Sequence, residues 1–394
     1  MVVALAILML APDAASASEM KRGLGVGGPF ASFVTRDGQA GGKDAPEQVF
    51  RGIGDYLNQK NYVASDIRAM GFDFVRVSIN PAILLRSEGP LRDELFAELR
   101  KGVDYYRGAG LKVLFNLQFW TPDPVWNWES VLNPQGGQFE AYREIVRRSA
   151  ELLASYPQGD VSFEPMNEPA SSNCEDPKTG WLAKQRTLLA DIRAISPTLP
   201  VLVSGCVGQL DGLLTLDKSN IDMSDPNLLY SFHFYEPFFF THQTSPTNFP
   251  HIDTVPYPAS SAPLTNALAA AIANIKAASI PDDQKTREEN VARREFFKYA
   301  VLAPDRAFIK RRLATVSAWA KKNGIPPDRI IMGEFAALNW SDRDSEPYRR
   351  SRVAWDRDVR AEAEAAGFAW AFWVSPLKDD ISEALDLPPS TTPP

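Results

Sequence analysis

The sequence predicts an α/β fold in which eight parallel strands and their helices close a (β/α)8 barrel, the TIM-barrel architecture. Three observations support this prediction. Segments of strand and helix character alternate eight times along the chain. Each strand segment is a nearly continuous apolar run, which is typical of strands buried on both faces of a parallel sheet. The length of 394 residues also suits one large barrel domain.

Eight segments rich in β-branched and aromatic residues are interpreted as the barrel strands. In chain order they cover residues 23–30, 72–79, 112–119, 161–168, 199–206, 228–235, 329–335 and 368–374. Helical spacing of apolar residues, with Gly or Pro near the ends, predicts helices. These helices cover residues 62–70, 93–109, 139–156, 181–195 and 346–366. The connections between strands are long enough for right-handed crossovers.

The interval between the sixth and seventh strands is out of proportion, at about ninety residues. Residues 244–264 are rich in Pro and Ser, and helical patterns follow at residues 265–278, 284–300 and 305–322. One of these helices belongs to the barrel, and the remainder is interpreted as a long insertion. Loops of this length in a compact domain are usually functional or disordered.

The two ends of the chain are expected to lie outside the (β/α)8 domain, which we place at residues 18–386. Residues 2–11 are apolar but too few to span a bilayer, and Ala15-Ser16-Ala17 is the pattern of a signal-peptidase site. We therefore interpret residues 1–17 as a removable export signal, which makes the protein secreted or periplasmic; a buried N-terminal helix is the alternative. Residues 387–394 are poor in packing side chains and are predicted to be disordered.

Composition excludes several classes of partner. The net charge is −7, and this acidic balance argues against binding to nucleic acid or to an anionic membrane surface. No stretch predicts a membrane span, and we expect a monomer. Cys174 and Cys206 are too few for a disulfide scaffold, and no Cys/His spacing indicates zinc. Both cysteines follow barrel strands, so a single bridge and two separate thiols are equally open.

Two glutamates stand where barrel chemistry is expected. Glu168 ends the fourth strand directly before Pro169, and Glu334 lies near the end of the seventh strand. The carboxyl ends of barrel strands carry the functional residues, so these carboxylates would face each other across the barrel mouth. Glycoside hydrolysis needs such a pair, because one group protonates the leaving oxygen and the other attacks the anomeric carbon. A surface position for Glu168 is the alternative.

Five short motifs fall on the predicted strands in a fixed order. They are Val75-Arg76-Val77, Asn167-Glu168-Pro169, His233-Phe234-Tyr235, Gly333-Glu334-Phe335 and Trp373. Each motif is weak alone, but together they make the chain resemble glycoside hydrolase family 5. This is the cellulase-like family of retaining (β/α)8 enzymes, and the resemblance covers nearly the whole chain after the export signal.

The resemblance implies roles for the two carboxylates and their neighbours. Glu168 would be the acid/base, and Glu334 would be the nucleophile that forms a covalent glycosyl-enzyme. Asn167 would bind the sugar hydroxyl next to the anomeric carbon. Arg76 would keep Glu334 charged, since a nearby cation favours the charged form of a carboxylate. A purely structural Arg–Glu pair is the alternative for Arg76.

The resemblance also implies residues that contact substrate. His233 and Tyr235 would line the site, with Tyr235 near Glu334. Trp373 would form the floor under the sugar at the point of cleavage, and a core position is its alternative.

One position departs from the family. Gln118 stands at the end of the third strand, where many members have His, so fine substrate specificity is in doubt. An amide can bind a hydroxyl but cannot titrate. We expect Gln118 to contact substrate, with a structural hydrogen bond as the alternative. Trp120, Trp126 and Trp128 follow within one loop, where stacking on sugars and packing of the loop are both open.

These features predict a retaining β-glycosidase that hydrolyses a β-linked glucan, as a polysaccharide or oligosaccharide, without a metal or organic cofactor. A transglycosylase that remodels an envelope glucan or exopolysaccharide is one alternative, and a β-mannan is an alternative substrate. A catalytically silent carbohydrate-binding barrel is disfavoured, because binding has no use for the pair of glutamates. Linkage and endo or exo action stay open.

Overall fold

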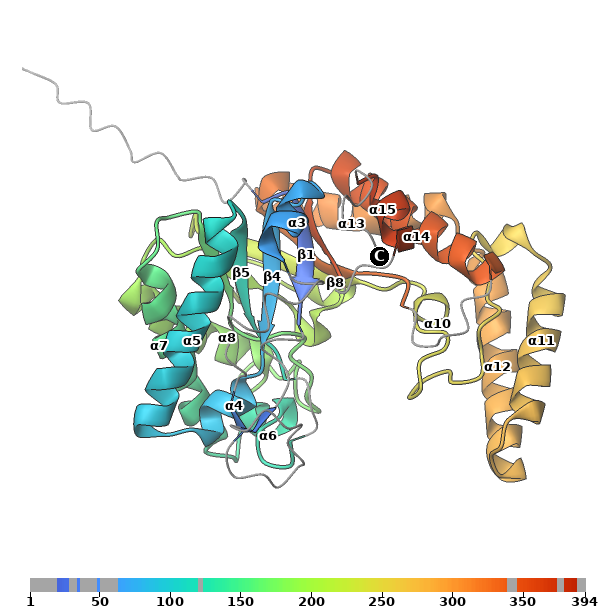
Figure 1. Ribbon diagram of the computed structural model, residues 1–394, viewed down its shortest axis with the longest axis horizontal. Coiled ribbons are helices and arrows are strands. Elements are labelled where there is room, and N and C mark those ends of the chain that lie inside the picture. The colour runs from blue at the N-terminus through green and yellow to red at the C-terminus, as the bar shows by residue number, and fades with distance from the viewer. Residues whose placement is uncertain are drawn as a thin grey trace, which may run out of the picture.

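Eight parallel strands form a closed barrel, as the sequence predicts (Figure 1). They are β1 (Arg22–Val26), β4 (Phe74–Ile79), β5 (Lys112–Leu117), β6 (Val161–Glu164), β7 (Val201–Val203), β8 (Leu228–Phe234), β9 (Ile330–Phe335) and β10 (Ala369–Phe372). Neighbours around the barrel follow chain order, and β1 closes the ring between β10 and β4. The (β/α)8 prediction is therefore confirmed, with each predicted strand present and somewhat shorter than expected.

The computed structural model describes residues 20–27, 34–35, 48–49, 63–119, 123–338, 346–373 and 379–387. The expected export signal, residues 388–394 of the expected tail and Trp120 lie outside these residues. Two short strands, β2 (Val34–Thr35) and β3 (Gln48–Val49), form an antiparallel pair beside the barrel and were not predicted. Within these described ranges, no helix is both long enough and apolar enough to cross a bilayer.

The predicted helices are present with boundaries shifted by a few residues. They are α3 (Ala64–Ala69), α5 (Gly89–Gly108), α7 (Gln138–Ala154), α8 (Trp181–Ile195), α13 (Arg306–Asn323) and α14 (Glu346–Ala365), and α15 (Asp379–Leu385) follows β10. The regular alternation fails between β7 and β8. That connection holds only the 3-10 turn η2 (Cys206–Gly208) and the one-turn helix α9 (Leu210–Leu213).

Two short helices that the sequence did not reveal follow β4 and β5. Asn80 caps α4 (Pro81–Arg86) by accepting a hydrogen bond from Ala82 N at 3.1 Å. Asn127 and Ser130 form a capping box at the start of α6 (Trp128–Leu132). Helices of five or six residues are too short for apolar periodicity to reveal, so only their caps carry a signal.

The barrel interior has an apolar layer toward the amino ends of the strands and a polar layer toward their carboxyl ends. Side chains alternate between the two faces of a strand, so every second residue points inward. The apolar layer contains Met20, Phe74, Leu114, Leu202, Leu229, Ile331, Ala369 and Ala371. One step further along β4 and β6, the inward positions are taken by Arg76 and Glu164, which are both buried. The change from apolar to charged side chains marks the end of the barrel where the site lies.

The outer face of β8 and β9 packs on α14 through Trp355. Its indole ring stacks on Phe234, with centroids 6.0 Å apart and an interplanar angle of 13°. The ring nitrogen donates a hydrogen bond to the carbonyl of Glu236 at 3.1 Å. Phe335 also contacts this ring, at 6.5 Å between centroids. Trp355 therefore fixes the two strands that carry His233 and Glu334 of the predicted site.

The connection between β8 and β9 contains α10 (Phe238–Thr241), α11 (Leu264–Ala277) and α12 (Asp282–Leu302) before α13. Figure 1 shows α11 and α12 side by side, projecting away from the barrel. The segment before α11 packs on α12 and α14, because Tyr299 Oη donates to Pro256 O at 2.6 Å and Tyr257 N donates to Ser351 Oγ at 3.1 Å. The projecting pair is thereby attached to the barrel.

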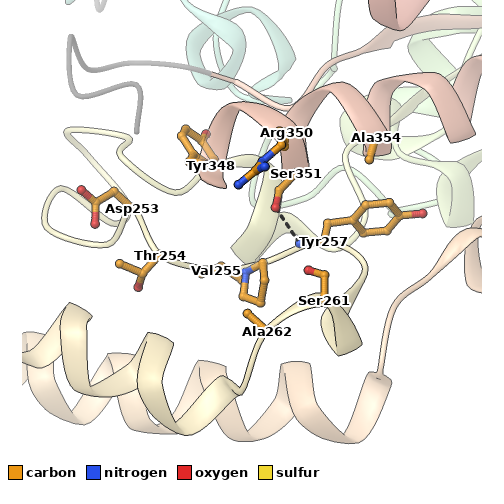
Figure 2. A pocket seen from close by; sticks show the side chains of 11 residues that line it. Asp253, Thr254, Val255, Tyr257, Ser261, Ala262, Tyr348, Arg350, Ser351 and Ala354 are labelled. Carbon is orange, nitrogen blue, oxygen red and sulfur yellow. Dashed lines mark hydrogen bonds between the residues drawn. The ribbon is translucent and has the colours of Figure 1, made fainter. Parts of the chain in front are cut away.

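A cavity of about 540 Å³ lies between this segment and the first turns of α14. Figure 2 shows the side chains of Tyr348, Arg350 and Ser351 opposite residues 253–262 across this space. None of the residues that the sequence assigns to the catalytic site lines this cavity. It lies between the β8–β9 connection and α14.

We predict that Trp355→Ala lowers the free energy of unfolding by about 3–5 kcal/mol, because a fully buried indole is replaced by a cavity and a hydrogen bond is lost. Urea denaturation followed by circular dichroism measures the change. Phe297→Ala is the control, since that ring on α12 is 71% exposed, and its effect is expected within about 0.5 kcal/mol. Equal effects of the two substitutions would contradict the assigned role of Trp355.

Candidate active site

The carboxyl ends of four barrel strands bring the sequence-predicted polar residues together. Arg76 lies within β4, and Asn167 and Glu168 follow β6. His233 lies within β8, and Glu334 lies within β9. Parallel strands place their carboxyl ends at one rim, so residues far apart in sequence meet there. Arg76 is bonded to Asn167 and Glu334, Glu168 is bonded to His233, and His233 Nδ1 lies 3.5 Å from Glu334 Oε2, so contacts connect all five residues.

Arg76 is fully buried and connects three side chains. Its Nε donates to Glu164 Oε2 at 2.8 Å, its Nη1 to Glu334 Oε1 at 2.6 Å and its Nη2 to Asn167 Oδ1 at 2.6 Å. Burial disfavours the charged guanidinium, but the carboxylates of Glu164 and Glu334 outweigh it and raise the pKa of Arg76. The planar fork of Arg suits three partners in fixed directions, which Lys could not reproduce.

Glu164 is a member of this network that sequence reasoning missed. It is buried at the end of β6 and pairs with Arg76. The signal was present, because alternation along β6 places Glu164 inward with Ser162. A buried carboxylate needs a partner. Arg76, the one cation within an apolar strand at the same level, supplies it.

A β-bulge directs Glu334 into the barrel. The register of β8 and β9 pairs Phe232 with Met332 but His233 with Glu334, so Gly333 is an extra residue. Without it, alternation would place Glu334 on the outer face, because Ile331 already points inward. Glycine is required there, since a Cβ on Gly333 would lie 2.8 Å from Ser231 Oγ and 3.1 Å from His233 Nε2.

Glu334 has partners on both carboxylate oxygens. Arg76 contacts Oε1, and the hydroxyl of Tyr235 donates to Oε2 at 2.9 Å. Burial and the charges of Glu334 and Glu168 raise the pKa of Tyr235 well above its usual value, so its hydroxyl stays a donor. The Glu334 side chain is 5% exposed. Its position is therefore fixed from two sides.

Glu168 lies at the rim and is more open to solvent. Its side chain is 35% exposed, and Oε1 shares a hydrogen bond of 2.7 Å with His233 Nδ1. Burial opposes protonation of His233, but Glu334 and the contact with Glu168 outweigh it and raise the pKa of His233. The backbone of Glu168 has φ of 40°, a strained left-handed conformation for a residue other than Gly.

The two carboxylates approach each other closely. One ligand-type atom from each of Glu168, His233 and Glu334 lies within 4.8 Å of the others. This donor set has the chemistry to hold a cation. However, Arg76 and Tyr235 already contact the Glu334 oxygens, and the positive charge of Arg76 opposes a metal ion beside it. The arrangement suits two carboxylates that act on an uncharged group between them.

Three further residues considered from the sequence, Gln118, Trp373 and Trp128, follow other barrel strands. Gln118 follows β5, is half-buried and accepts a hydrogen bond from Asn116 Nδ2 at 3.2 Å. Trp373 follows β10 and is half-buried next to Gly25, where a Cβ would lie 3.0 Å from the indole. Trp128 donates its ring nitrogen to the carbonyl of Asn167 at 3.1 Å. Trp128 thus supports the site from behind, a role that sequence reasoning left open.

His242 is the C-cap residue of α10, and its ring contacts that of Tyr235. Its ring stacks on Phe238, with centroids 3.7 Å apart, and meets Tyr235 edge to face at 5.2 Å. Burial lowers the pKa of His242 to about 4. The neutral imidazole is therefore part of the folded state around neutral pH.

We predict that His242 makes the fold sensitive to acid. Its pKa is lowered on folding, so the unfolded chain binds a proton that the native state excludes as pH falls from about 6.5 to 4. The cost should approach about 2–3 kcal/mol at pH 4. Denaturant titrations at pH 7 and pH 4.5 should show a smaller loss of stability in His242→Gln than in wild type. Equal losses would exclude the effect.

We predict that Arg76→Met lowers the free energy of unfolding by about 3–5 kcal/mol, because it leaves Glu164 and Glu334 buried without a cation. Adding Glu164→Gln should recover part of the loss, because one of the two uncompensated charges is removed. Chemical denaturation measures all three proteins. Arg357→Met, which breaks an exposed pair with Glu383, is the control and should cost less than about 1 kcal/mol. A loss of that size in Arg76→Met would refute the pairing argument.

Comparison with known proteins shows the family of the chain. The family model for cellulase (glycosyl hydrolase family 5) matches residues 39–378. Endoglucanase 3 of Fibrobacter succinogenes is 24% identical over 282 residues, which cover 71% of this chain and 39% of that protein. Endoglucanase H of Acetivibrio thermocellus is 23% identical over 314 residues, covering 79% of this chain and 26% of that protein. The chain thus spans well under half the length of both relatives.

Among solved structures, the clostridial cellulose synthase subunit Z from Clostridioides difficile superposes with a TM-score of 0.63 and 22% identity. The match covers 93% of this chain and 99% of that one, which shows a shared fold. The family match extends over most of the sequence, including every strand from β4 to β10. The chain therefore belongs to glycosyl hydrolase family 5, the cellulase family.

Proposed function

We propose that the protein is a retaining β-glycosidase that hydrolyses a β-linked glucan by double displacement. One observation carries the proposal: an oxygen of Glu168 and an oxygen of Glu334 lie within 4.8 Å of each other. Retaining enzymes hold their carboxyl groups about 5 Å apart, whereas inverting enzymes leave about 6.5–9.5 Å for a water molecule. The short separation supports attack by a carboxylate rather than by water in the first step.

The surroundings of the two groups support different roles. Glu334 is held by Arg76 and Tyr235 and is almost closed to solvent, which suits a nucleophile that must point at one carbon atom. Glu168 is bonded to His233 and is one-third exposed, so it can exchange protons with solvent between the two steps. We assign Glu334 as the nucleophile and Glu168 as the acid/base.

The reaction then balances in two displacements. An oxygen of Glu334 forms a bond to the anomeric carbon as the glycosidic bond breaks. The bonding electron pair stays on the leaving oxygen, which takes a proton from Glu168. In the second step, Glu168 accepts a proton from water while the water oxygen attacks the anomeric carbon and Glu334 departs. The configuration of the sugar is retained because each displacement inverts it once.

The other predicted residues are proposed to contact the sugar. Asn167 is aimed by Arg76 toward the hydroxyl beside the anomeric carbon, and Trp373 forms the floor next to Gly25. Gln118 lies at the same rim, where its amide retains free hydrogen-bonding capacity. We also propose, from its N-terminal sequence, that the protein is exported and acts outside the cytoplasm. A glucan is favoured over a mannan because both curated relatives are named endoglucanases.

We expect Glu334→Gln and Glu168→Gln to fold and to lose activity. Removing the acid/base should reduce kcat by about 10²–10⁴-fold, and removing the nucleophile should reduce it at least as much. Rates on soluble β-glucans, with melting temperature measured in parallel, test this, and Glu383→Gln on the surface is the control. Product configuration followed by NMR should show retention. Inverted product would refute the proposed mechanism.

A further inference from the structure

The loop after β7 contacts Glu168 directly. A Cβ built on Gly208 would lie 3.1 Å from Glu168 Cγ, 3.4 Å from its Cα and 3.7 Å from His233 Nδ1. The next residue, Gln209, forms an isolated β-bridge with His233. Gly208 thus packs on both partners of the hydrogen bond that holds the Glu168 carboxylate.

The loops on both sides of this contact have strained backbones. Glu168 has φ of 40° and Val207 has φ of 60°, and both are residues other than Gly. Val207 is 38% exposed, so its side chain gives little packing to offset the strain. Each such conformation costs on the order of 1–3 kcal/mol and persists only where the surroundings enforce it. Another interaction must therefore hold the backbones of Glu168 and Val207 in these conformations.

The Cys174–Cys206 disulfide supplies that restraint. It joins the loop after β6 to the loop after β7, with 5.8 Å between the Cα atoms. Cys206 is adjacent to Val207, and Val207 N donates to the carbonyl of Pro169, next to Glu168, at 3.0 Å. On the other side, Trp181 N at the start of α8 donates to the carbonyl of Cys174 at 2.9 Å. The bridge therefore anchors both strained loops to a long helix.

We propose that the Cys174–Cys206 bridge and Gly208 are positioning elements for the acid/base Glu168. The inference rests on the proposed function. Glu334 is held by hydrogen bonds from Arg76 on β4 and from Tyr235 after β8, and neither donor belongs to the loops after β6 and β7. Loss of the bridge or of Gly208 therefore displaces the proton donor, Glu168, and leaves the nucleophile, Glu334, in place. The protein should then fail selectively on substrates whose leaving group needs a proton.

Two substrates with the same sugar separate the steps. 2,4-Dinitrophenyl β-cellobioside releases a stable anion that departs without a proton, whereas phenyl β-cellobioside requires acid assistance. Both are measured as kcat/KM, which reports the first displacement. For Cys174→Ala/Cys206→Ala and for Gly208→Ala, we expect kcat/KM on the phenyl substrate to fall by about tenfold or more. On the dinitrophenyl substrate it should fall by less than about threefold, since Glu334 is unmoved.

Gly324→Ala is a matched control. Gly324 has φ of 72° against 65° for Gly208, but nothing lies within 4 Å of its added Cβ. Gly324→Ala therefore has a similar cost in backbone strain but makes no contact with Glu168. The ratio of kcat/KM on the phenyl substrate to kcat/KM on the dinitrophenyl substrate should equal that of wild type. Misfolding lowers both rates equally and also leaves the ratio unchanged. An unchanged ratio in both the double cysteine variant and Gly208→Ala would overturn the proposal.

Glu168→Ala separates failure of this inference from failure of the proposed function. If Glu168 is the acid/base, its removal must itself reduce the phenyl rate far more than the dinitrophenyl rate. If Glu168→Ala selectively loses the phenyl rate but Cys174→Ala/Cys206→Ala and Gly208→Ala do not, only the positioning role is refuted. If Glu168→Ala shows no selectivity, the acid/base assignment fails, and the positioning proposal fails with it.

Discussion

The site depends on one buried cation. Arg76 lies inside the barrel, where an unpaired charge would cost several kcal/mol, so its presence requires acceptors on every side. Glu164 and Asn167 come from the β6 end and Glu334 comes from β9. The guanidinium fork thereby fixes the directions of the proposed nucleophile, Glu334, and of the Asn167 amide, which is proposed to bind the sugar. A buried apolar layer fills the barrel on the amino-terminal side of this network.

The two glutamates are held by different means. Strand register and two side-chain donors fix Glu334, and the bulge at Gly333 gives it its direction. Glu168 depends on irregular backbone after β6 and on contact with the loop after β7. A rigid strand suits a group that must meet one atom in one geometry. A loop at the solvent edge suits a group that must lose and regain a proton, because water can reach it.

The sequence was sufficient for the barrel and for much of the rim. Eight continuous apolar runs, most of them separated by helical segments, predict buried parallel strands, and polar residues at their carboxyl ends then meet by topology. The bulge at Gly333 could not be predicted, because an extra residue is a property of the pairing between β8 and β9. Likewise, the bond between Cys174 and Cys206 depends on where two loops lie relative to each other. Glu164 was missed for a different reason: its partner Arg76 had been assigned entirely to Glu334.

The separation between Arg76 and Glu334 has a consequence for how the protein is made. The two residues are 258 positions apart, and α11, α12 and α13 all stand between β8 and β9. Arg76 and its partner Glu164 both precede these helices in the chain and are therefore synthesised first. Glu334 joins them only after the projecting helices have been translated. A chain that stops within the β8–β9 connection therefore lacks Glu334, the proposed nucleophile, and cannot carry out the proposed reaction.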